Sequence, residues 1–217
     1  MGFDSFTEHL AEINRISCDQ LPTPQVAVLR RAVAALRKCG IVEKCLQPGE
    51  TAPDFNFINA DNEQSSLYSL LAHGPAVINF FRGFWCNFCR TELEAYQKVL
   101  SQFEVLGACY LAVSPNQQIP VQEEYRNYQT VCDCDNQIGR SFGIVYELQD
   151  EEKSLFTDWG ICLDEVNQCK KWELPLPATY LIGQDRLVEF QYVDADFRKR
   201  LSPAELIEAL TRFKSRA

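Results

Sequence analysis

The sequence predicts an α/β fold in which a central mixed β-sheet is flanked by helices and preceded by a helical N-terminal extension. An apolar run at 76–81, an amphipathic stretch from 89 to 103 and a second apolar run at 105–113 form the pattern of a strand, a crossover helix and a parallel strand. Near the C-terminus, two alternating segments at 178–182 and 187–192 flank a turn signal, which is typical of a hairpin. Together these patterns require parallel and antiparallel strands in one sheet.

The first 47 residues predict two amphipathic helices. Two apolar stripes have helical spacing, one between residues 3 and 16 and one after Pro24: Phe6, Leu10, Ile13, Ile16, and then Val26, Leu29, Val33, Leu36. Pro48-Gly49 ends this region. We therefore divide the chain into a helical arm, 1–47, and an α/β domain, 48–217. We expect the arm to pack on the core or on a second copy of the chain in a homodimer.

The middle of the chain alternates short strands and helices. Phe55, Phe57 and Leu67 predict short strands around a turn at Asp61-Asn62. The helix predicted at 89–103 buries Leu93, Tyr96, Leu100 and Phe103. Further segments predict a helix at 123–128, a strand at 130–132 and a short helix at 138–142. Residues 148–174 are polar and predict an irregular surface insertion, with the acidic run 149–153 as a solvated loop.

The last helix carries a clear start signal. Ser202 and Glu205 have the spacing of a capping box, and Pro203 occupies the first helical position. The apolar residues that follow at helical spacing are Leu206, Leu210 and Phe213. The chain therefore ends on a helix that packs against the sheet.

Composition narrows the class of protein. The 217 residues carry a net charge of −9 and no long basic run, which argues against nucleic-acid binding. The longest apolar segment, 75–81, is too short to cross a membrane. The N-terminal residues have no lysine or arginine before Arg15 and no continuous apolar run, so they do not resemble a signal peptide. We expect a cytoplasmic protein that binds neither nucleic acid nor membrane.

Two of the ten cysteines stand out by their position. Cys86 and Cys89 follow the buried strand and open the predicted helix. A helix N-terminus lowers a thiol pKa from about 8.5, and two intervening residues let both sulfurs meet in a disulfide. Two cysteines at this spacing can also form half of a zinc site. The strand before the pair and the helix after it favour a redox pair instead.

The remaining cysteines give weaker signals. A zinc site built from Cys132, Cys134, Cys162 and Cys169 is not favoured, because one intervening residue is unusual for zinc ligands and no histidine accompanies them. For Cys39 and Cys45 three interpretations stay open: a further resolving pair, a contact in a dimer, or small apolar side chains that pack in the core. Cys109 lies in a predicted core strand, and Cys18 lies in a linker without a local signal. We expect no metal and no cofactor.

Several motifs together resemble a known family. They are FFRGFWCNFC at 80–89, APDF at 52–55, RTEL at 90–93, LPATY at 176–180 and VDADFR at 193–198. Across about 48–214 the chain resembles the peroxiredoxin-like branch of the alkyl hydroperoxide reductase and thiol-specific antioxidant family, within the thioredoxin-like superfamily. The resemblance implies a thioredoxin-like fold with a cis peptide bond before Pro177, which would face the cysteine pair. It also implies that Arg82 supports the thiolate or a peroxide oxygen and that Trp85 shields the pair.

The implied activity is reduction of hydrogen peroxide or alkyl hydroperoxides. One cysteine would become a sulfenic acid and condense with the other to a disulfide, which thioredoxin or another dithiol would reduce. The family's motif P-x-x-x-T-x-x-C would place Cys89 as the attacking cysteine, with Cys86 in place of the threonine and Arg82 in place of the proline. Alignment on thioredoxin would instead make Cys86 the attacking cysteine. A thioredoxin-like disulfide oxidoreductase and a redox-sensing protein are the alternative functions.

Overall fold

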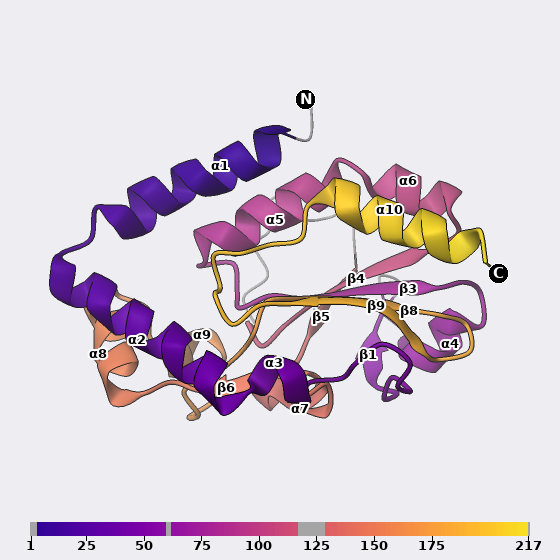
Figure 1. The fold of residues 1–217 in the computed structure, drawn as a ribbon. Helices are drawn as coiled ribbons and strands as arrows, with labels where there is room; N and C mark the ends of the chain where they lie inside the picture. The colour runs from indigo at the N-terminus through magenta and orange to yellow at the C-terminus, as the bar shows by residue number, and fades with distance from the viewer. Residues whose placement is uncertain (1–3, 60–61, 117–128, 217) are drawn as a thin grey trace.

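A five-stranded mixed sheet forms the centre of the molecule (Figure 1). The computed structural model describes residues 4–59, 62–116 and 129–216. The strand order is β5-β4-β3-β8-β9, with β3, β4 and β5 parallel and β8 and β9 antiparallel to their neighbours. This arrangement confirms the predicted mixed sheet. The strands are β3 (Ala76–Phe80), β4 (Cys109–Ser114), β5 (Gln129–Cys132), β8 (Ala178–Ile182) and β9 (Val188–Val193).

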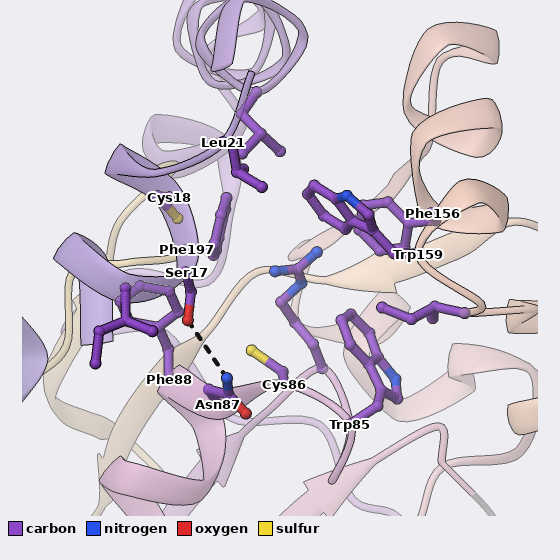
Figure 2. A pocket seen from close by; sticks show the side chains of 14 residues that line it. Ser17, Cys18, Leu21, Trp85, Cys86, Asn87, Phe88, Phe156, Trp159 and Phe197 are labelled. Carbon is purple, nitrogen blue, oxygen red and sulfur yellow. Dashed lines mark hydrogen bonds between the residues drawn. The ribbon is translucent and has the colours of Figure 1, made fainter. Parts of the chain in front are cut away.

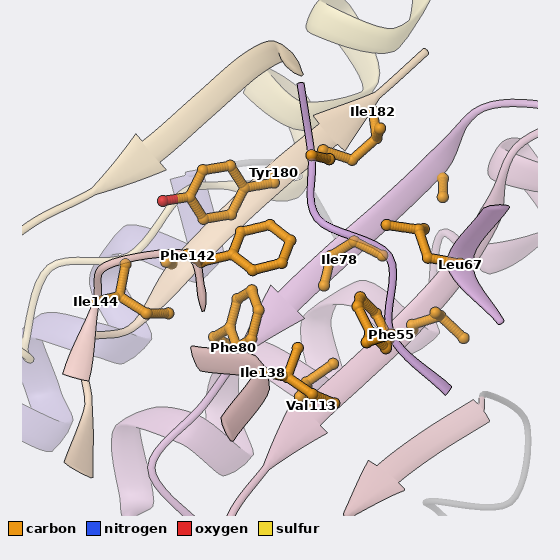
Figure 3. Packing of buried hydrophobic residues seen from close by; sticks show 14 of the residues in the cluster. Phe55, Leu67, Ile78, Phe80, Val113, Ile138, Phe142, Ile144, Tyr180 and Ile182 are labelled. Atoms are coloured by element: carbon orange, nitrogen blue, oxygen red, sulfur yellow. The ribbon is translucent and has the colours of Figure 1, made fainter. Parts of the chain in front are cut away.

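Helices cover one face of the sheet, and a layer of short elements covers the other (Figure 1). Because both faces are covered, every residue of β3 is buried, and its sequence is apolar except for Asn79, whose Nδ2 donates to Thr179 Oγ1. Val77 packs into the cluster below the helices, whereas Ile78 and Phe80 pack with Phe142 and Tyr180 on the opposite face (Figure 3). The helical layer comprises α5 (Asn87–Gln97), α6 (Leu100–Val105) and α10 (Pro203–Lys214). The second layer comprises α3 (Ile41–Lys44), β1 (Asn56–Ile58), β2 (Gln64–Ser66), α4 (Leu67–Leu71) and α7 (Gln137–Ser141).

The N-terminal arm packs on the core of the same chain. It consists of α1 (Asp4–Asn14), a π-helical turn, η1 (Arg15–Asp19), and α2 (Thr23–Cys39). Helix α1 runs alongside α5, and α2 contacts the downstream helix α8 (Asp150–Asp158) (Figure 1). Cys18 and Leu29 of the arm are buried in the apolar cluster of the helical face. The two predicted arm helices are confirmed, and the division of the chain at residues 47 and 48 stays a prediction.

The prediction of an irregular surface insertion at 148–174 is wrong. The segment contains α8, α9 (Leu163–Val166) and β7 (Glu173–Pro175), which pairs with β6 (Val145–Glu147). It has an apolar cluster of its own, which contains Leu148, Phe156, Leu163 and Leu174. The acidic run is the start of α8 rather than a loop, because the Gln149 N–H donates to Glu152 Oε2 at 3.0 Å and acidic side chains are favourable at a helix N-terminus.

The helix predicted at 89–103 is two helices. Helix α5 ends at Gln97 and α6 begins at Leu100, with Val99 in a non-helical conformation between them. The short strand at 130–132 is confirmed as β5, and the short helix at 138–142 as α7, which a 3-10 turn at Cys134–Asn136 precedes. The helix predicted at 123–128 lies outside the described residues.

The C-terminal predictions are confirmed. Strands β8 and β9 form the expected antiparallel hairpin. The Ser202 Oγ accepts a hydrogen bond from the Glu205 N–H, and the Ser202 N–H donates to the Glu205 carboxylate, so the capping box is formed. Leu206 and Leu210 are buried. Across the described ranges, no helix has the length and apolar character needed to cross a lipid bilayer.

Candidate active site

The cysteine pair lies where β3 leads into α5. Cys86 is the N-cap residue of α5, and Cys89 lies in the first turn of the helix. Gly83 shapes the connecting loop, because it has a φ of 148° and a Cβ there would lie 2.4 Å from Trp85 Nε1. Asn116, which follows β4, holds the loop by accepting a hydrogen bond from the Phe84 N–H at 3.0 Å. The loop geometry therefore depends on two neighbouring strand ends.

Cys86 is positioned to be a thiolate. Its pKa is lowered to about 5, chiefly because the Cys89 thiol donates a hydrogen bond to it and, against the cost of burial, because the charges of Arg82 and Arg200 are near. The side chain is 5% exposed, and its sulfur points into a pocket (Figure 2). At neutral pH the sulfur at the pocket wall is thus negatively charged.

Cys89 has the opposite character. Its side chain is fully buried, and burial, followed by the hydrogen bond to Cys86, raises its pKa well above the usual range for a thiol. Arg200 Nη2 donates to Cys89 Sγ at 3.4 Å, which opposes this rise without reversing it. Cys89 therefore stays protonated and serves as the hydrogen-bond donor to Cys86.

Arg82 is a buried cation in an aromatic environment. It is 3% exposed, and its guanidinium carbon lies 4.5 Å from the ring centroid of Phe197, 4.9 Å from that of Trp85 and 5.4 Å from that of Phe156. Its Nε is buried and has no hydrogen-bond partner within the described part of the chain. The residue predicted to support the thiolate thus lowers the Cys86 pKa and retains one unused donor.

A buried ion pair that the sequence analysis missed lies behind the cysteines. Arg200 Nη1 contacts Glu92 Oε2 at 2.5 Å, and neither side chain is more than 3% exposed. Burial raises the pKa of Glu92 to about 7 although the charge of Arg200 opposes the rise. The position of Glu92, three residues after Cys89 on one helix face, was an available signal, whereas Arg200 is 108 residues away from Glu92 in the sequence.

The pocket beside Cys86 has a volume of about 320 Å³ and is walled by three parts of the chain (Figure 2). The loop and first turn around Cys86 form its floor, together with Arg82 and Trp85. The arm supplies Ile16, Leu21 and Leu29, and α8 with the segment after it supplies Phe156, Trp159 and Ile161.

Cys18, which had no signal in the sequence, also lines this pocket. Asn87 Nδ2 donates to Ser17 Oγ at 3.4 Å and thereby ties the arm to α5.

The cis peptide bond expected before Pro177 is wrong. The described residues contain no cis peptide bond, so the bond between Leu176 and Pro177 is trans. Strand β7 ends at Pro175 and β8 begins at Ala178, and between them the Leu176 N–H donates to the Ile144 carbonyl at 2.8 Å. This short connection fits the trans form, which X-Pro bonds favour. Pro177 is buried next to Ala178, the partner of Phe80 in the sheet, and is not a lining residue of the pocket.

Apart from Cys18, the other cysteines do not line this pocket. Cys132 and Cys134 are exposed with their sulfurs 3.6 Å apart. Cys39 and Cys45 each donate to a carbonyl of their own helix or turn, at Leu36 and Val42. Cys109 lies in β4, where burial raises its pKa to about 11. In the segments that the structure describes, no three histidine, cysteine or acidic side chains gather in a way that would hold a metal ion.

Comparison with known proteins places this site in a family. A family model described as the AhpC/TSA family matches residues 48–191, more than half of the chain. The thioredoxin-like protein YneN of Bacillus subtilis (strain 168) is 21% identical over 156 residues, which are 72% of this chain and 77% of that protein.

Solved structures of peroxiredoxins have the same fold. The peroxidoxin BcpB of Mycobacterium tuberculosis matches 77% of this chain and 97% of its own, with 18% identity and a TM-score of 0.53. The 2-Cys peroxiredoxin of Plasmodium vivax matches 77% and 82%, with 16% identity and a TM-score of 0.57. Peroxiredoxin Q of Xanthomonas campestris matches 74% and 91%, with 17% identity and a TM-score of 0.54. The chain, with its thioredoxin-like fold, therefore belongs to the AhpC/TSA family, the family of thiol peroxidases that its motifs resemble.

Proposed function

We propose that this protein reduces hydroperoxides, with Cys86 as the attacking thiolate and Cys89 as the resolving thiol. The observation that carries the proposal is the contrast between the two sulfurs. Cys86 has a pKa lowered to about 5 and lines a pocket, whereas Cys89 is buried behind it and stays protonated. A nucleophile must be both ionised and accessible, so the geometry favours Cys86 for the first step.

In the first step, the Cys86 thiolate attacks the terminal oxygen of the hydroperoxide. An S–O bond forms, the O–O bond breaks, and Cys86 becomes a sulfenic acid. The other oxygen leaves as an alkoxide, or as hydroxide when the substrate is hydrogen peroxide, and takes a proton from solvent. Arg82 lies near Cys86 and has an unused Nε donor, so it is placed to stabilise the negative charge that develops on the leaving oxygen.

In the second step, the Cys89 sulfur attacks the Cys86 sulfenic sulfur. Cys89 gives up its proton, hydroxide leaves from Cys86 and combines with that proton as water, and a disulfide forms. Arg200, which donates to Cys89 Sγ, stabilises the negative charge on this sulfur as the proton leaves. An external dithiol, such as thioredoxin, then returns two electrons by thiol exchange and restores both thiols.

A disulfide oxidoreductase is the second candidate. The position that carries threonine in the peroxide-binding motif of the family is Cys86 here, so this hydroxyl is missing. A low-pKa cysteine at a helix N-terminus with a buried partner is also an arrangement that exchanges with other disulfides. This candidate predicts reduction of protein disulfides without fast reaction with peroxide.

Stopped-flow tryptophan fluorescence separates the two candidates, because Trp85 adjoins Cys86 and reports on its oxidation. The reduced protein should show a fast phase with hydroperoxide, at a rate far above that of an ordinary thiol. Cys86→Ser should lose this phase, whereas Cys89→Ser should keep it and stop at the sulfenic acid. A fast phase that survives in Cys86→Ser would overturn the assignment of the attacking cysteine. Reduction of insulin disulfides without any fast phase in the wild type would favour the second candidate.

A further inference from the structure

Part of the wall around Cys86 comes from segments that family membership does not explain. The family model begins at residue 48, but Ile16, Leu21 and Leu29 of the arm line the pocket. On the opposite side, Trp159 closes the pocket from the end of α8 (Figure 2). Trp159 Nε1 donates to Gln25 Oε1 at 3.2 Å, so the two walls also contact each other. The arm therefore adds a wall to this pocket that lies outside the residues matched by the family model, and Trp159 contacts that wall.

Two of the three exposed residues that line the pocket in the described part of the chain are apolar, Ile16 and Trp159, and the third is Asn87. Ile16 is 52% exposed and Trp159 is 36% exposed, and both belong to the small set of large apolar side chains that are exposed in the described residues. A single exposed apolar residue is ordinary, but these two border the opening that leads to the reactive sulfur. An apolar rim favours a substrate that has an apolar body of its own.

Arg82 is the charged group in the pocket wall. It is buried among aromatic rings, and its Nε is without a hydrogen-bond partner among the described residues. A largely apolar pocket with a charged donor beside the nucleophile binds a molecule that has an apolar body and an oxygen-bearing end. The volume of about 320 Å³ is roughly ten times the volume that one water molecule occupies in the liquid, so hydrogen peroxide leaves most of it unused.

From these contacts we infer that the arm and α8 make the pocket selective for hydroperoxides with a bulky apolar body, such as an aromatic or branched group, over hydrogen peroxide. Ile16 and Trp159 are the residues that determine this specificity. The inference rests on the proposed function, because the bulky substrate reacts at Cys86 by the same two steps. Its apolar body packs against the two walls while its peroxide oxygens lie near Cys86 and Arg82.

The test compares cumene hydroperoxide with hydrogen peroxide in single turnovers of the reduced protein, measured as hydroperoxide consumed after rapid quenching. The variants are Ile16→Ser and Trp159→Ala, and Val105→Ser is the matched control, because Val105 is an apolar residue with 87% exposure on α6 that does not line the pocket. Each rim variant should lower the rate with cumene hydroperoxide by about 10-fold, the usual effect of losing apolar pocket contact. The rate with hydrogen peroxide should stay within about 2-fold, since that substrate does not reach the rim.

Different outcomes overturn different claims. Equal effects on both substrates, or no effect on either, would overturn the selectivity while the peroxidase function stands. If the Ile16 and Trp159 variants keep both hydroperoxide rates but thioredoxin reduces their Cys86–Cys89 disulfide more slowly, the rim is a docking surface for the reductant. That outcome would also overturn the inferred selectivity. If neither substrate reacts with the wild type faster than with an ordinary thiol, the proposed function itself fails.

A separate observation concerns Cys132 and Cys134 at the end of β5. Their sulfurs are 3.6 Å apart and both side chains are exposed. The intervening Asp133 is fixed, because its N–H donates to the Ser114 carbonyl and its carboxylate accepts from the Ile138 and Gly139 N–H groups at 2.8 Å. The turn therefore holds the two thiols together independently of Cys86 and Cys89.

The geometry points to a second oxidisable dithiol, which exchanges with low-molecular-weight disulfides. One thiolate attacks a disulfide such as oxidised glutathione, which releases one glutathione thiolate and leaves a mixed disulfide on the protein. The other cysteine then loses its proton and attacks this mixed disulfide, which forms the bond between Cys132 and Cys134. The second glutathione leaves as a thiolate, so two electrons pass from the protein to the oxidant.

The test uses the Cys86→Ser, Cys89→Ser double variant incubated with oxidised glutathione. Peptide mass spectrometry should show a peptide in which Cys132 and Cys134 have lost two hydrogens, whereas the solitary exposed Cys39 should carry glutathione as the matched control. Replacing Cys132 with serine in addition should leave glutathione attached to Cys134, which is the better candidate for the attacking thiolate because burial, followed by the hydrogen bond with Cys134, raises the pKa of Cys132 to about 12. The proposal is overturned if Cys132 and Cys134 each carry glutathione, pair with other cysteines, or stay reduced under conditions that modify Cys39.

Discussion

At the scale of single residues, two cysteines one helical turn apart have opposite protonation states. The difference arises from their environments, because Cys86 lies at the helix N-terminus beside Arg82, whereas Cys89 is enclosed by the core. The hydrogen bond between them lowers one pKa and raises the other. Cys89 therefore makes Cys86 more suited to the first step, whereas Cys89 must itself lose its proton before it can act in the second.

Alkylation of Cys86 tests this coupling directly. In the reduced wild type, the rate of Cys86 modification by iodoacetamide should rise with pH to half its maximum near pH 5, because only the thiolate reacts. Cys89→Ala should raise this midpoint most, since it removes the largest stabilising contact, and Cys89→Ser should raise it less because serine can still donate. Arg82→Gln should raise it as well, whereas Arg186→Gln, at a distant arginine over Tyr68, should not. A wild-type midpoint near 9 would contradict the account.

At the scale of secondary structure elements, the Glu92–Arg200 pair ties α5 to the segment before α10. Arg200 Nε and Nη2 also donate to the Phe197 carbonyl, which fixes the segment whose aromatic ring lies over Arg82. The pair thus connects the resolving cysteine, the buried cation and the C-terminal helix. This contact inside the core fixes the position of α5 relative to the segment before α10.

The two members of this pair should respond unequally to substitution. Glu92→Gln resembles protonated Glu92, which a pKa of about 7 makes half-populated at pH 7, so we expect a loss of only about 1 kcal/mol in the free energy of unfolding. Arg200→Met should cost more, about 3 kcal/mol, because it leaves the Phe197 carbonyl and the Glu92 carboxyl without their buried donor. Urea unfolding of the reduced variants measures both losses. Equal losses, or the reverse order, would show that the pair does not act in this way.

Some secondary structure elements could be predicted from the sequence, and others could not. The strand, the cysteine pair and the helix that follows them were readable because strong local signals, a buried apolar run and a helix opening, lie side by side. The α8 segment was missed because its acidic first turn looks like a solvated loop, while its apolar residues form a small cluster of their own around Phe156 and Leu163 that has no strong periodic signal in the sequence. The walls of the pocket have no local signal, because Leu29, Trp159 and Cys86 meet only in three dimensions.

At the scale of the whole molecule, the functional loops gather at one edge of the sheet. The cysteine loop follows β3, Asn116 follows β4 and the Cys132–Cys134 turn follows β5, so they share the carboxyl ends of three parallel strands. The arm and α8 then cover the first of these loops. A homodimer stays a prediction that the single chain does not test.

Ionisation of the site should appear in the stability of the whole molecule. Between about pH 5 and pH 9, the unfolded chain binds a proton at Cys86 and the folded chain does not, so this group makes stability rise with pH. Glu92 acts in the opposite sense between its ordinary pKa of 4.5 and about 7, where only the folded chain is protonated. In Cys86→Ala, the free energy of unfolding should therefore rise less steeply with pH between pH 7 and pH 9, by at most about 1.4 kcal/mol per pH unit. The measurement is urea unfolding of wild type and variant at several pH values. Equal slopes of the free energy of unfolding against pH would contradict the lowered pKa of Cys86.

The most direct test of the central claim is to trap the first oxidation product. Cys89→Ser, reduced and then mixed with one equivalent of hydroperoxide in the presence of dimedone, should carry the sulfenic acid adduct on Cys86 in peptide mass spectrometry. Cys86→Ser treated in the same way should carry no adduct on Cys89, since that thiol is buried and protonated. An adduct on Cys89 in Cys86→Ser, together with an unmodified Cys86 in Cys89→Ser, would reverse the roles of the two cysteines and contradict the account.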